Sequence, residues 1–441
     1  MSNRSDTNAK PSAKPRVLGP IELIAMGVGG MIGGGIFSVL GLAVQISGHG
    51  AWLAFSVGAL VALAAGYSYL KLALAFPTDG ASFTYVERGW PDHPFFAMLT
   101  GWTVIVGYVG TLALYAFTFG AYGADLLGKA GEGRLVPDLL SAAVLLFFLI
   151  VNLRGPRTSG ITEDLVVYAK ILLLAVFAVA GFVNMDKANL MPLFDRGVPN
   201  VFVAGAMVFV AYEGFQLINS AVEETRNPRR NVPIGIYGSI IIVSVIYIAL
   251  ALVSLGTLGE AGLIAHREYA LAEAARPVLG EAGTVLVAIA ALLATSSAIN
   301  ATVFGAARLM AQMGEEGKMP AILARRNAAS VPAIAVWLLV AAALALTLLG
   351  GLEIITAFSS MTFLLVSITV TLANLKLRRV SGAKVLPCLA GLVLMSVTVA
   401  LVVLHLANER ADLLLAILSF YATVAGASFA YLRAARASRR A

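Results

Sequence analysis

The chain has 441 residues, of which 59% are hydrophobic and only 12% charged, with a formal net charge of +7 at pH 7. A soluble domain carries about 25% charged residues, so this composition excludes a protein folded around one soluble core. The single cysteine, Cys388, excludes an intramolecular disulfide and a metal cluster built on thiolates. The apolar residues fall into blocks of roughly 18 to 25, the length with which a helix crosses ~30 Å of hydrocarbon. An all-α membrane protein is therefore predicted.

Twelve apolar blocks predict about twelve transmembrane helices. Five of them precede Asn184, at 21–46, 51–72, 95–127, 135–151 and 160–183. Seven follow it, at 201–222, 233–258, 284–310, 332–349, 352–375, 385–406 and 413–432. Residues 1–16 are too polar for a secretory signal and are expected to form a disordered tail.

The basic residues fall mostly on one side of these spans. With the N-terminus in the cytoplasm, 23 of the 31 Lys and Arg residues are cytoplasmic, seven are outside, and Lys170 lies within the membrane. Cytoplasmic loops carry such an excess, so both termini are expected in the cytoplasm, with the chain in a bacterial inner membrane. The same asymmetry explains the net charge without a nucleic-acid partner.

The first span is interrupted by glycines. The segment GVGGMIGGGIF at 27–37 holds six glycines, three of them consecutive at Gly33, Gly34 and Gly35. Each glycine costs about 1 kcal/mol relative to alanine inside a helix, so the backbone is expected to open there. Close helix packing is the alternative, since Gly29 and Gly33 have GxxxG spacing, but packing does not require three glycines in a row.

The sixth span has a comparable feature, because Glu213 and Gly214 lie midway along it. Interrupted helices at corresponding positions of two halves mark the midplane site of transporters built from inverted repeats. Spans one to five and six to ten are therefore expected to form two inverted halves, at about 17–185 and 198–376. The domain organisation is then a tail (1–16), a ten-helix core (17–376), and two further helices with a basic C-terminus (377–441).

A broken helix can bind both ends of a zwitterion. The first N–H groups of its second half face an anion, and the last carbonyls of its first half accept from a cation. An α-amino acid carries both charges, so the two breaks predict an amino acid site.

Two ionisable residues lie in the hydrocarbon. Lys170 is about ten residues into its span, hence ~15 Å deep, with opened carbonyls of span one and the hydroxyls of Ser296 and Ser297 as expected partners. A snorkelling lysine is the alternative. Glu213 can bind a substrate amine, carry a proton, pair with Lys170, or stay protonated and stabilise the break, and the sequence leaves these alternatives open.

Six segments in a fixed order carry a family resemblance. They are GGMIGGGIF in span one, AFPTDGASFTYVERGWP at 75–91, NLRGPRTSG at 152–160, AYEGF at 211–215, EETRNPRRNVP at 223–233, and RLMAQMGEEGKMP ending at Pro320. Together they resemble the amino acid, polyamine and organocation transporters, which have the LeuT-type fold, over nearly the whole chain.

The resemblance implies a substrate site at the two breaks, with helices one and six discontinuous. By position, Gly34 and Gly35 supply N–H donors to a carboxylate, and the carbonyls of Met31, Val210 and Glu213 face an amine. The chain departs from the family at Gly34, where a side chain is common, and at Val210, where an aromatic gate is common. Gly33 and Gly214 flank these positions, and Tyr212 and Tyr108 are the expected replacements for the gate.

The resemblance also implies proton coupling, because Lys170 falls where sodium-independent members carry a lysine in place of a sodium ion. A desolvated ammonium can release its proton as the site opens and regain it later. The expected partners are an amino acid or amine, protons and the lipid bilayer, with no cofactor or metal; the oligomeric state is not predicted.

The function expected from these features is proton-coupled uptake of small neutral or moderately polar amino acids by alternating access. The alternative is a carrier or exchanger of cationic amino acids or polyamines, because Glu213 offers a carboxylate. A membrane enzyme is disfavoured, since HExxH and GxSxG are absent and the four histidines are scattered. A sensor is disfavoured too, since no extra soluble domain would transmit a signal.

Overall fold

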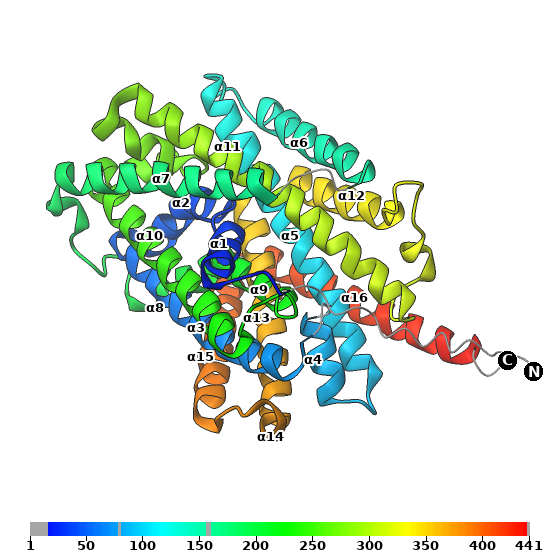
Figure 1. The fold of residues 1–441 in the computed structure, drawn as a ribbon. Coiled ribbons are helices and arrows are strands. Elements are labelled where there is room, and N and C mark those ends of the chain that lie inside the picture. The colour runs from blue at the N-terminus through cyan, green and yellow to red at the C-terminus, as the bar shows by residue number, and fades with distance from the viewer. Residues whose placement is uncertain (1–15, 78–80, 156–159, 439–441) are drawn as a thin grey trace, which may run out of the picture.

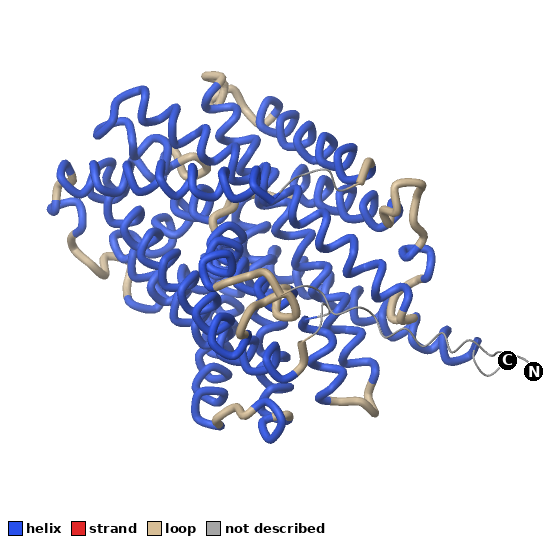
Figure 2. Tube along the Cα trace, viewed as in Figure 1, coloured by secondary structure: helices blue, strands red, loops and turns tan. Residues whose placement is uncertain are grey.

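The computed structural model describes residues 16–77, 81–155 and 160–438, and the named elements in these ranges are all helices (Figure 2). Residues 1–15 of the tail expected at 1–16, and parts of the segments at 75–91 and 152–160, lie outside the described residues. Spans one to five are α1 (Pro20–Met31) with α2 (Gly35–Ser47), α3 (Ala51–Ala75), α5 (Pro94–Leu126), α6 (Leu135–Leu153) and α7 (Gly160–Asn184).

The remaining spans follow in the same order. They are α8 (Val198–Met207) with η3 (Val208–Gln216) and α9 (Leu217–Ser220), α10 (Pro228–Ala265), α11 (Ala270–Glu315), α12 (Ala333–Leu349), α13 (Leu352–Lys376), α15 (Val385–Glu409) and α16 (Ala411–Ser438). The short helices are η1 (Gly48–Gly50), α4 (Ala81–Gly89), η2 (Lys187–Leu190), η4 (Ala321–Ala324) and α14 (Arg378–Ser381).

The prediction of a helical membrane protein is confirmed. Ten segments of the described residues are long and apolar enough to cross a membrane. One of them, Gly35–Ala75, contains both α2 and α3, and the shorter apolar helices Pro20–Met31 and Ala333–Leu349 supply the rest of the expected pattern. The first and sixth spans are discontinuous, as the sequence predicts.

Some helices extend beyond the predicted spans. Hydropathy leaves the segment between spans seven and eight outside the hydrocarbon. In the structure this segment is helical up to Ala265 and again from Ala270. Gly259 (φ 72°) and Gly280 (φ 65°) have left-handed conformations inside α10 and α11, so each long element consists of two helices that meet at a kink. Only glycine adopts such angles at little cost, which explains why the chain turns at these positions.

The helices pack as two groups around two hydrophobic cores, and α5 and α11 contribute residues to both cores. The first group, here called the bundle, comprises α1, α2, α3, α8 with η3, and α10. The second, here called the scaffold, comprises α5, α6, α11 and α12. Figure 1 shows α1 near the centre of the molecule and α6 and α12 near its edge. The site must therefore be sought where α1 faces the scaffold.

The other long helices surround these groups. Helix α7 packs against α10 and α11, and so joins bundle to scaffold, while α13 packs against α3 and α5. Helices α15 and α16 are added at the outside, α15 against α3, α8 and α13, and α16 against α5 and α15. Large apolar side chains such as Phe147, Val179 and Leu386 are exposed on the peripheral helices, which is the surface that lipid requires.

Candidate functional site

The first span breaks at the glycine triplet. Helix α1 ends at Met31, Ile32 to Gly34 are not helical, and α2 begins at Gly35. A helix end leaves its last carbonyls without intrahelical donors, and a helix start leaves its first N–H groups without acceptors. The break thus places carbonyls and N–H groups beside each other in the middle of the span.

The three glycines are also needed for packing. A Cβ built on Gly35 would lie 2.6 Å from the Cβ of Ala211, and one on Gly34 would lie 2.8 Å from the ring of Tyr115. One on Gly33 would lie 3.0 Å from both Tyr115 and Ala298. The break and the close packing, which the sequence suggested as alternatives, are therefore both present.

The sixth span is interrupted differently. Residues 208–216 form a 3₁₀ helix, so this backbone is wound more tightly rather than opened. The N–H of Val210 donates to Ser360 Oγ (3.0 Å), which donates to the carbonyl of Met207 (2.6 Å). Helix α13 therefore supplies the polar contacts that this segment needs where its hydrogen-bond pattern changes.

The two breaks cross at a pair of glycines. A Cβ on Gly214 would lie 2.1 Å from the backbone carbon of Gly30 and from the nitrogen of Met31. No other residue type permits this approach. Tyr247 adds a second connection, because its hydroxyl lies 2.7 Å from the carbonyl of Met31 and 3.2 Å from that of Ala211.

A cavity of about 360 Å³ lies beside this crossing, between bundle and scaffold. Of the predicted site residues, Tyr108, Glu213, Gly214 and Ser297 line it. The lining residues that sequence reasoning missed are Leu18, Glu22, Ala25, Met26, Gly29, Gly30, Thr111, Tyr115, Val167, Gln216, Leu217, Ala298, Ala301, Thr302, Gly305, Ala306 and Phe363. Because these include Leu18, which precedes α1, and Glu22 in its first turn, the cavity reaches the N-terminal end of the first span.

Several predicted residues lie behind the cavity wall. Met31 and Val210 are buried and make the contacts described above, and Gly33, Gly34 and Gly35 lie against the packed side chains of α5, α11 and η3. Tyr212, an expected gate residue, lies in the core of the bundle, where its hydroxyl donates to the carbonyl of Phe55 (2.9 Å). Its ring packs against that of Tyr247 with centroids 5.3 Å apart.

Glu213 lines the cavity and has one carboxylate oxygen without a partner among the described residues. Its Oε2 accepts from Gln216, whereas its Oε1 has no hydrogen-bond partner among the described residues and is buried. A buried carboxylate oxygen without a donor is costly, so this atom is available for a ligand or a proton. Glu213 and the exposed Glu22 are the charged residues in the lining.

Lys170 lies at the first break. Its side chain is 1% exposed, and Nζ donates to the carbonyls of Gly29 (2.9 Å) and Ile32 (2.5 Å). The predicted backbone partners are thus confirmed, and the ammonium lies at the negative end of the α1 dipole. Ser296 is partly buried on α11, which packs against α7, and Ser297 lines the cavity.

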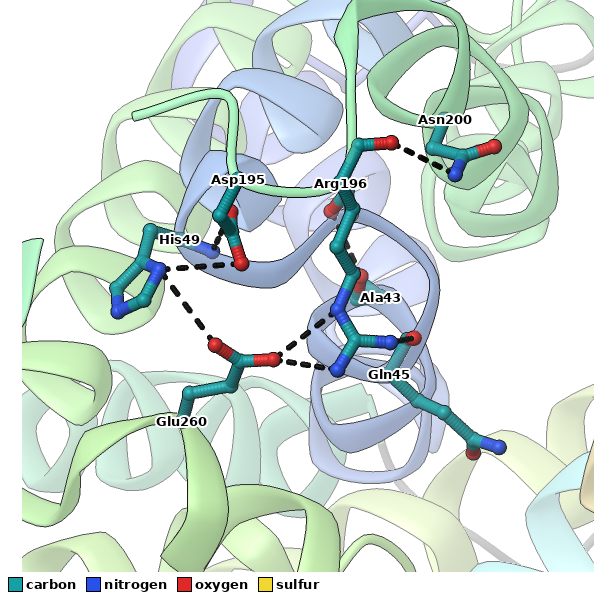
Figure 3. Close-up of polar contacts among 8 residues, drawn as sticks. Ala43, Gln45, His49, Asp195, Arg196, Asn200 and Glu260 are labelled. Carbon is teal, nitrogen blue, oxygen red and sulfur yellow. Dashed lines mark hydrogen bonds and ion pairs between the residues drawn. The ribbon is translucent and has the colours of Figure 1, made fainter. Parts of the chain in front are cut away.

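A polar cluster closes the opposite end of the first span (Figure 3). His49 Nδ1 lies 3.3 Å from Asp195 Oδ2 and 3.5 Å from Glu260 Oε2. The guanidinium of Arg196 binds the other oxygen of Glu260 and the carbonyl of Gln45. The cluster joins three segments that are far apart in the sequence, at 45–49, 195–196 and 260, and no motif pointed to it.

Comparison with known proteins identifies the family. The amino acid permease family model matches residues 18–429. The chain is 30% identical to the branched-chain amino acid permease BcaP of Bacillus subtilis over 75% of this chain and 74% of the relative. It is 29% identical to the inner membrane transport protein YbaT of Escherichia coli, over 72% and 73%, and 29% identical to cationic amino acid transporter 5 of Arabidopsis thaliana, over 85% and 69%. These relatives are transporters and not enzymes. The chain belongs to the amino acid permease family of the amino acid, polyamine and organocation transporters.

Proposed function

We propose that this permease carries amino acids by alternating access, driven by protons and independent of sodium. The supporting observation is the position of Lys170, whose buried ammonium donates to the carbonyls of Gly29 and Ile32 at the end of α1. The ammonium supplies, at the carbonyls that end α1, the positive charge that a bound metal ion would otherwise supply.

Loss of the Lys170 proton would weaken its bonds to α1. Since α7 packs against both α10 and α11, this would loosen the connection between bundle and scaffold and allow them to reorient. Protonation is then the coupling event. In this scheme the bundle and the scaffold, each of which contains helices from both expected halves (about 17–185 and 198–376), move relative to each other around the breaks.

The substrate would lie between the breaks. The N–H groups at the start of α2 suit its carboxylate, and the carbonyls of Met31, Val210 and Glu213 suit its amine. In the described conformation Met31, Val210 and the start of α2 lie behind the cavity wall, so the substrate would reach them only when the two groups of helices reorient. The carbonyl of Met31 already accepts from Tyr247, but a carbonyl has a second lone pair for an amine.

The side chain of the substrate would face a largely apolar wall. Met26, Ala298, Ala301, Leu217 and Phe363 line the cavity, and they favour small neutral or moderately polar amino acids. The similarity to a branched-chain amino acid permease supports the same class.

A cationic amino acid or polyamine is the second candidate. Glu213 Oε1 has no partner among the described residues, and both charged residues of the lining are acidic. A guanidinium or ammonium would satisfy this oxygen. The similarity to a cationic amino acid transporter is consistent with this alternative.

The basic residues support an orientation with both termini in the cytoplasm of a bacterium. The cavity, which reaches Leu18, would then be open inward in the described conformation.

Uptake into proteoliposomes tests the proposal. Labelled alanine, arginine and putrescine are offered with an inward proton gradient, with and without sodium. We expect the proton gradient to drive accumulation of alanine and sodium to have no effect. Stimulation by sodium would contradict the coupling, and accumulation of arginine or putrescine alone would favour the second candidate.

A further inference from the structure

The cluster of His49, Asp195 and Glu260 has the arrangement of a metal site. One ligand atom from each residue lies within 4.8 Å of the others. His49 Nδ1 is buried and makes no hydrogen bond in the described part of the chain, although two carboxylate oxygens lie 3.3 and 3.5 Å away. In the tautomer with its proton on Nε2, His49 Nδ1 and the two carboxylate oxygens bring three lone pairs together, an arrangement that a bound cation stabilises.

The remaining oxygens of the two carboxylates are already bonded to the protein. Asp195 Oδ1 accepts from the backbone N–H of His49 (3.1 Å), and Glu260 Oε1 accepts from Arg196 Nε (3.0 Å). Outer donors of this kind orient metal-binding carboxylates. As a result Asp195 Oδ2 and Glu260 Oε2 face the imidazole (Figure 3).

Two of the three separations between the candidate ligand atoms fit a transition metal, and the two carboxylate oxygens lie within 4.8 Å of each other. Tetrahedral Zn²⁺ binds nitrogen and oxygen at ~2.0–2.2 Å, which places its ligands roughly 3.3–3.6 Å apart. The distances of 3.3 and 3.5 Å from His49 Nδ1 fall in this range. One imidazole with carboxylates suits Zn²⁺ better than Ca²⁺ or Mg²⁺, which prefer all-oxygen sites.

We propose that His49, Asp195 and Glu260 bind Zn²⁺ or a similar divalent transition metal at the end of the first span remote from the N-terminus. With neutral His49 and the charge of Arg196 included, the four side chains carry one net negative charge, which favours a divalent cation. Water would complete the coordination, because Asp195 is exposed.

The site joins three segments: the end of the first span, the loop before the sixth span, and the last part of α10. His49 lies in η1 after α2, Asp195 precedes α8, and Glu260 lies in α10 beyond the kink at Gly259. A ligand stabilises the conformation in which its ligating atoms are together. The metal would hold this end closed and so inhibit transport. This inhibition rests on the proposed function, whereas the binding of the metal does not.

Calorimetric titration of the full-length protein with ZnCl₂ at neutral pH tests the binding. We expect one Zn²⁺ per chain, with affinity reduced at least about tenfold in His49→Ala, because even the loss of an outer partner weakens metal binding by 10–100-fold. The matched control is His93→Ala, an exposed histidine elsewhere, which should bind Zn²⁺ as the parent does. Asp195→Asn is the second variant, and thermal melting without metal establishes that each variant is folded.

Equal binding by the parent, His49→Ala and Asp195→Asn, or no binding by the parent, would overturn the site. In proteoliposomes, micromolar Zn²⁺ should slow uptake by the parent and not by His49→Ala. If Zn²⁺ binds but does not slow uptake by an active parent, the metal site stands and its proposed effect on transport is wrong.

Discussion

The two halves of the first span have opposite surroundings. Helix α1 lines the cavity, and its residues Glu22, Met26 and Gly29 are exposed or partly exposed. Helix α2 is buried from Gly35 to Val44, and a Cβ on Gly41 would lie 2.4 Å from the backbone of Arg267. One helix therefore borders the cavity while its continuation is buried, and Lys170 binds at the junction. The alternating access proposed above would require this difference to reverse by movement around the break.

The largest expected effect concerns the point at which the two breaks cross. Gly214→Ala would force a Cβ against the backbone of Gly30 and Met31, and we expect destabilisation of about 3 kcal/mol or more, with little folded protein recovered. The matched control is Gly305→Ala, a cavity glycine whose Cβ would meet nothing within 4 Å. Thermal melting and recovery of purified protein measure both. Equal stability of the two variants would show that the crossing is not as close as described.

The next effect concerns the open half. If Glu213 recognises a substrate cation, Glu213→Gln should weaken arginine binding at least about tenfold and leave alanine binding unchanged. Glu22→Gln, at the exposed mouth, should change arginine binding much less, because water screens its charge. Competition binding to the purified protein measures both. Equal loss of every substrate in Glu213→Gln would instead indicate that the glutamate carries the coupled proton.

A smaller effect is expected where α13 supports the second break. Ser360→Ala removes the hydroxyl that joins the Val210 N–H to the Met207 carbonyl, and should cost about 1–3 kcal/mol. The neighbouring Ser359→Ala is the control, since its equally buried hydroxyl bonds only to its own helix, at Ile355. Thermal melting compares them. If Ser359→Ala is as unstable as Ser360→Ala, the contact of Ser360 with the second break has no special role in stability.

The smallest effect concerns the sealed half. Arg196→Ala breaks the contacts to Glu260 and Gln45 and should favour opening of that end by about 1.4-fold to fivefold, as partly exposed ion pairs contribute ~0.2–1 kcal/mol. Opening of the end at Arg196 should close the cavity at the other end. In a Cys388→Ser background, the new cysteine of Thr302→Cys should then react more slowly with a thiol reagent. Lys129→Ala, which breaks an exposed ion pair with Glu132, should leave the rate unchanged. A faster reaction in Arg196→Ala would contradict the coupling of the two ends.

The sequence predicted the features that depend on composition along one helix. Hydropathy located the spans, the glycine triplet located the first break, and the depth of Lys170 predicted a buried polar partner. These inferences succeed because the bilayer imposes the length and polarity of each segment.

Features that depend on side-chain direction could not be predicted. Tyr212 and Tyr247 are both tyrosines in apolar spans, and only the packing of α3, α10 and η3 turns one toward Phe55 and the other toward Met31. The 3₁₀ winding of residues 208–216 depends on contacts from α13, more than 140 positions away in the sequence. His49, Asp195 and Glu260 are likewise brought together only by the fold.

The central claim is that Lys170 couples protons to amino acid transport, and the most direct test is uptake by Lys170→Ala. Purified protein should still bind substrate in a thermal-shift assay, because the proposed site is formed by the two breaks. In proteoliposomes with an imposed inward proton gradient, the parent and the matched control Lys187→Ala, an exposed lysine, should concentrate substrate. Lys170→Ala should only equilibrate it. Accumulation by Lys170→Ala driven by the proton gradient would contradict the account.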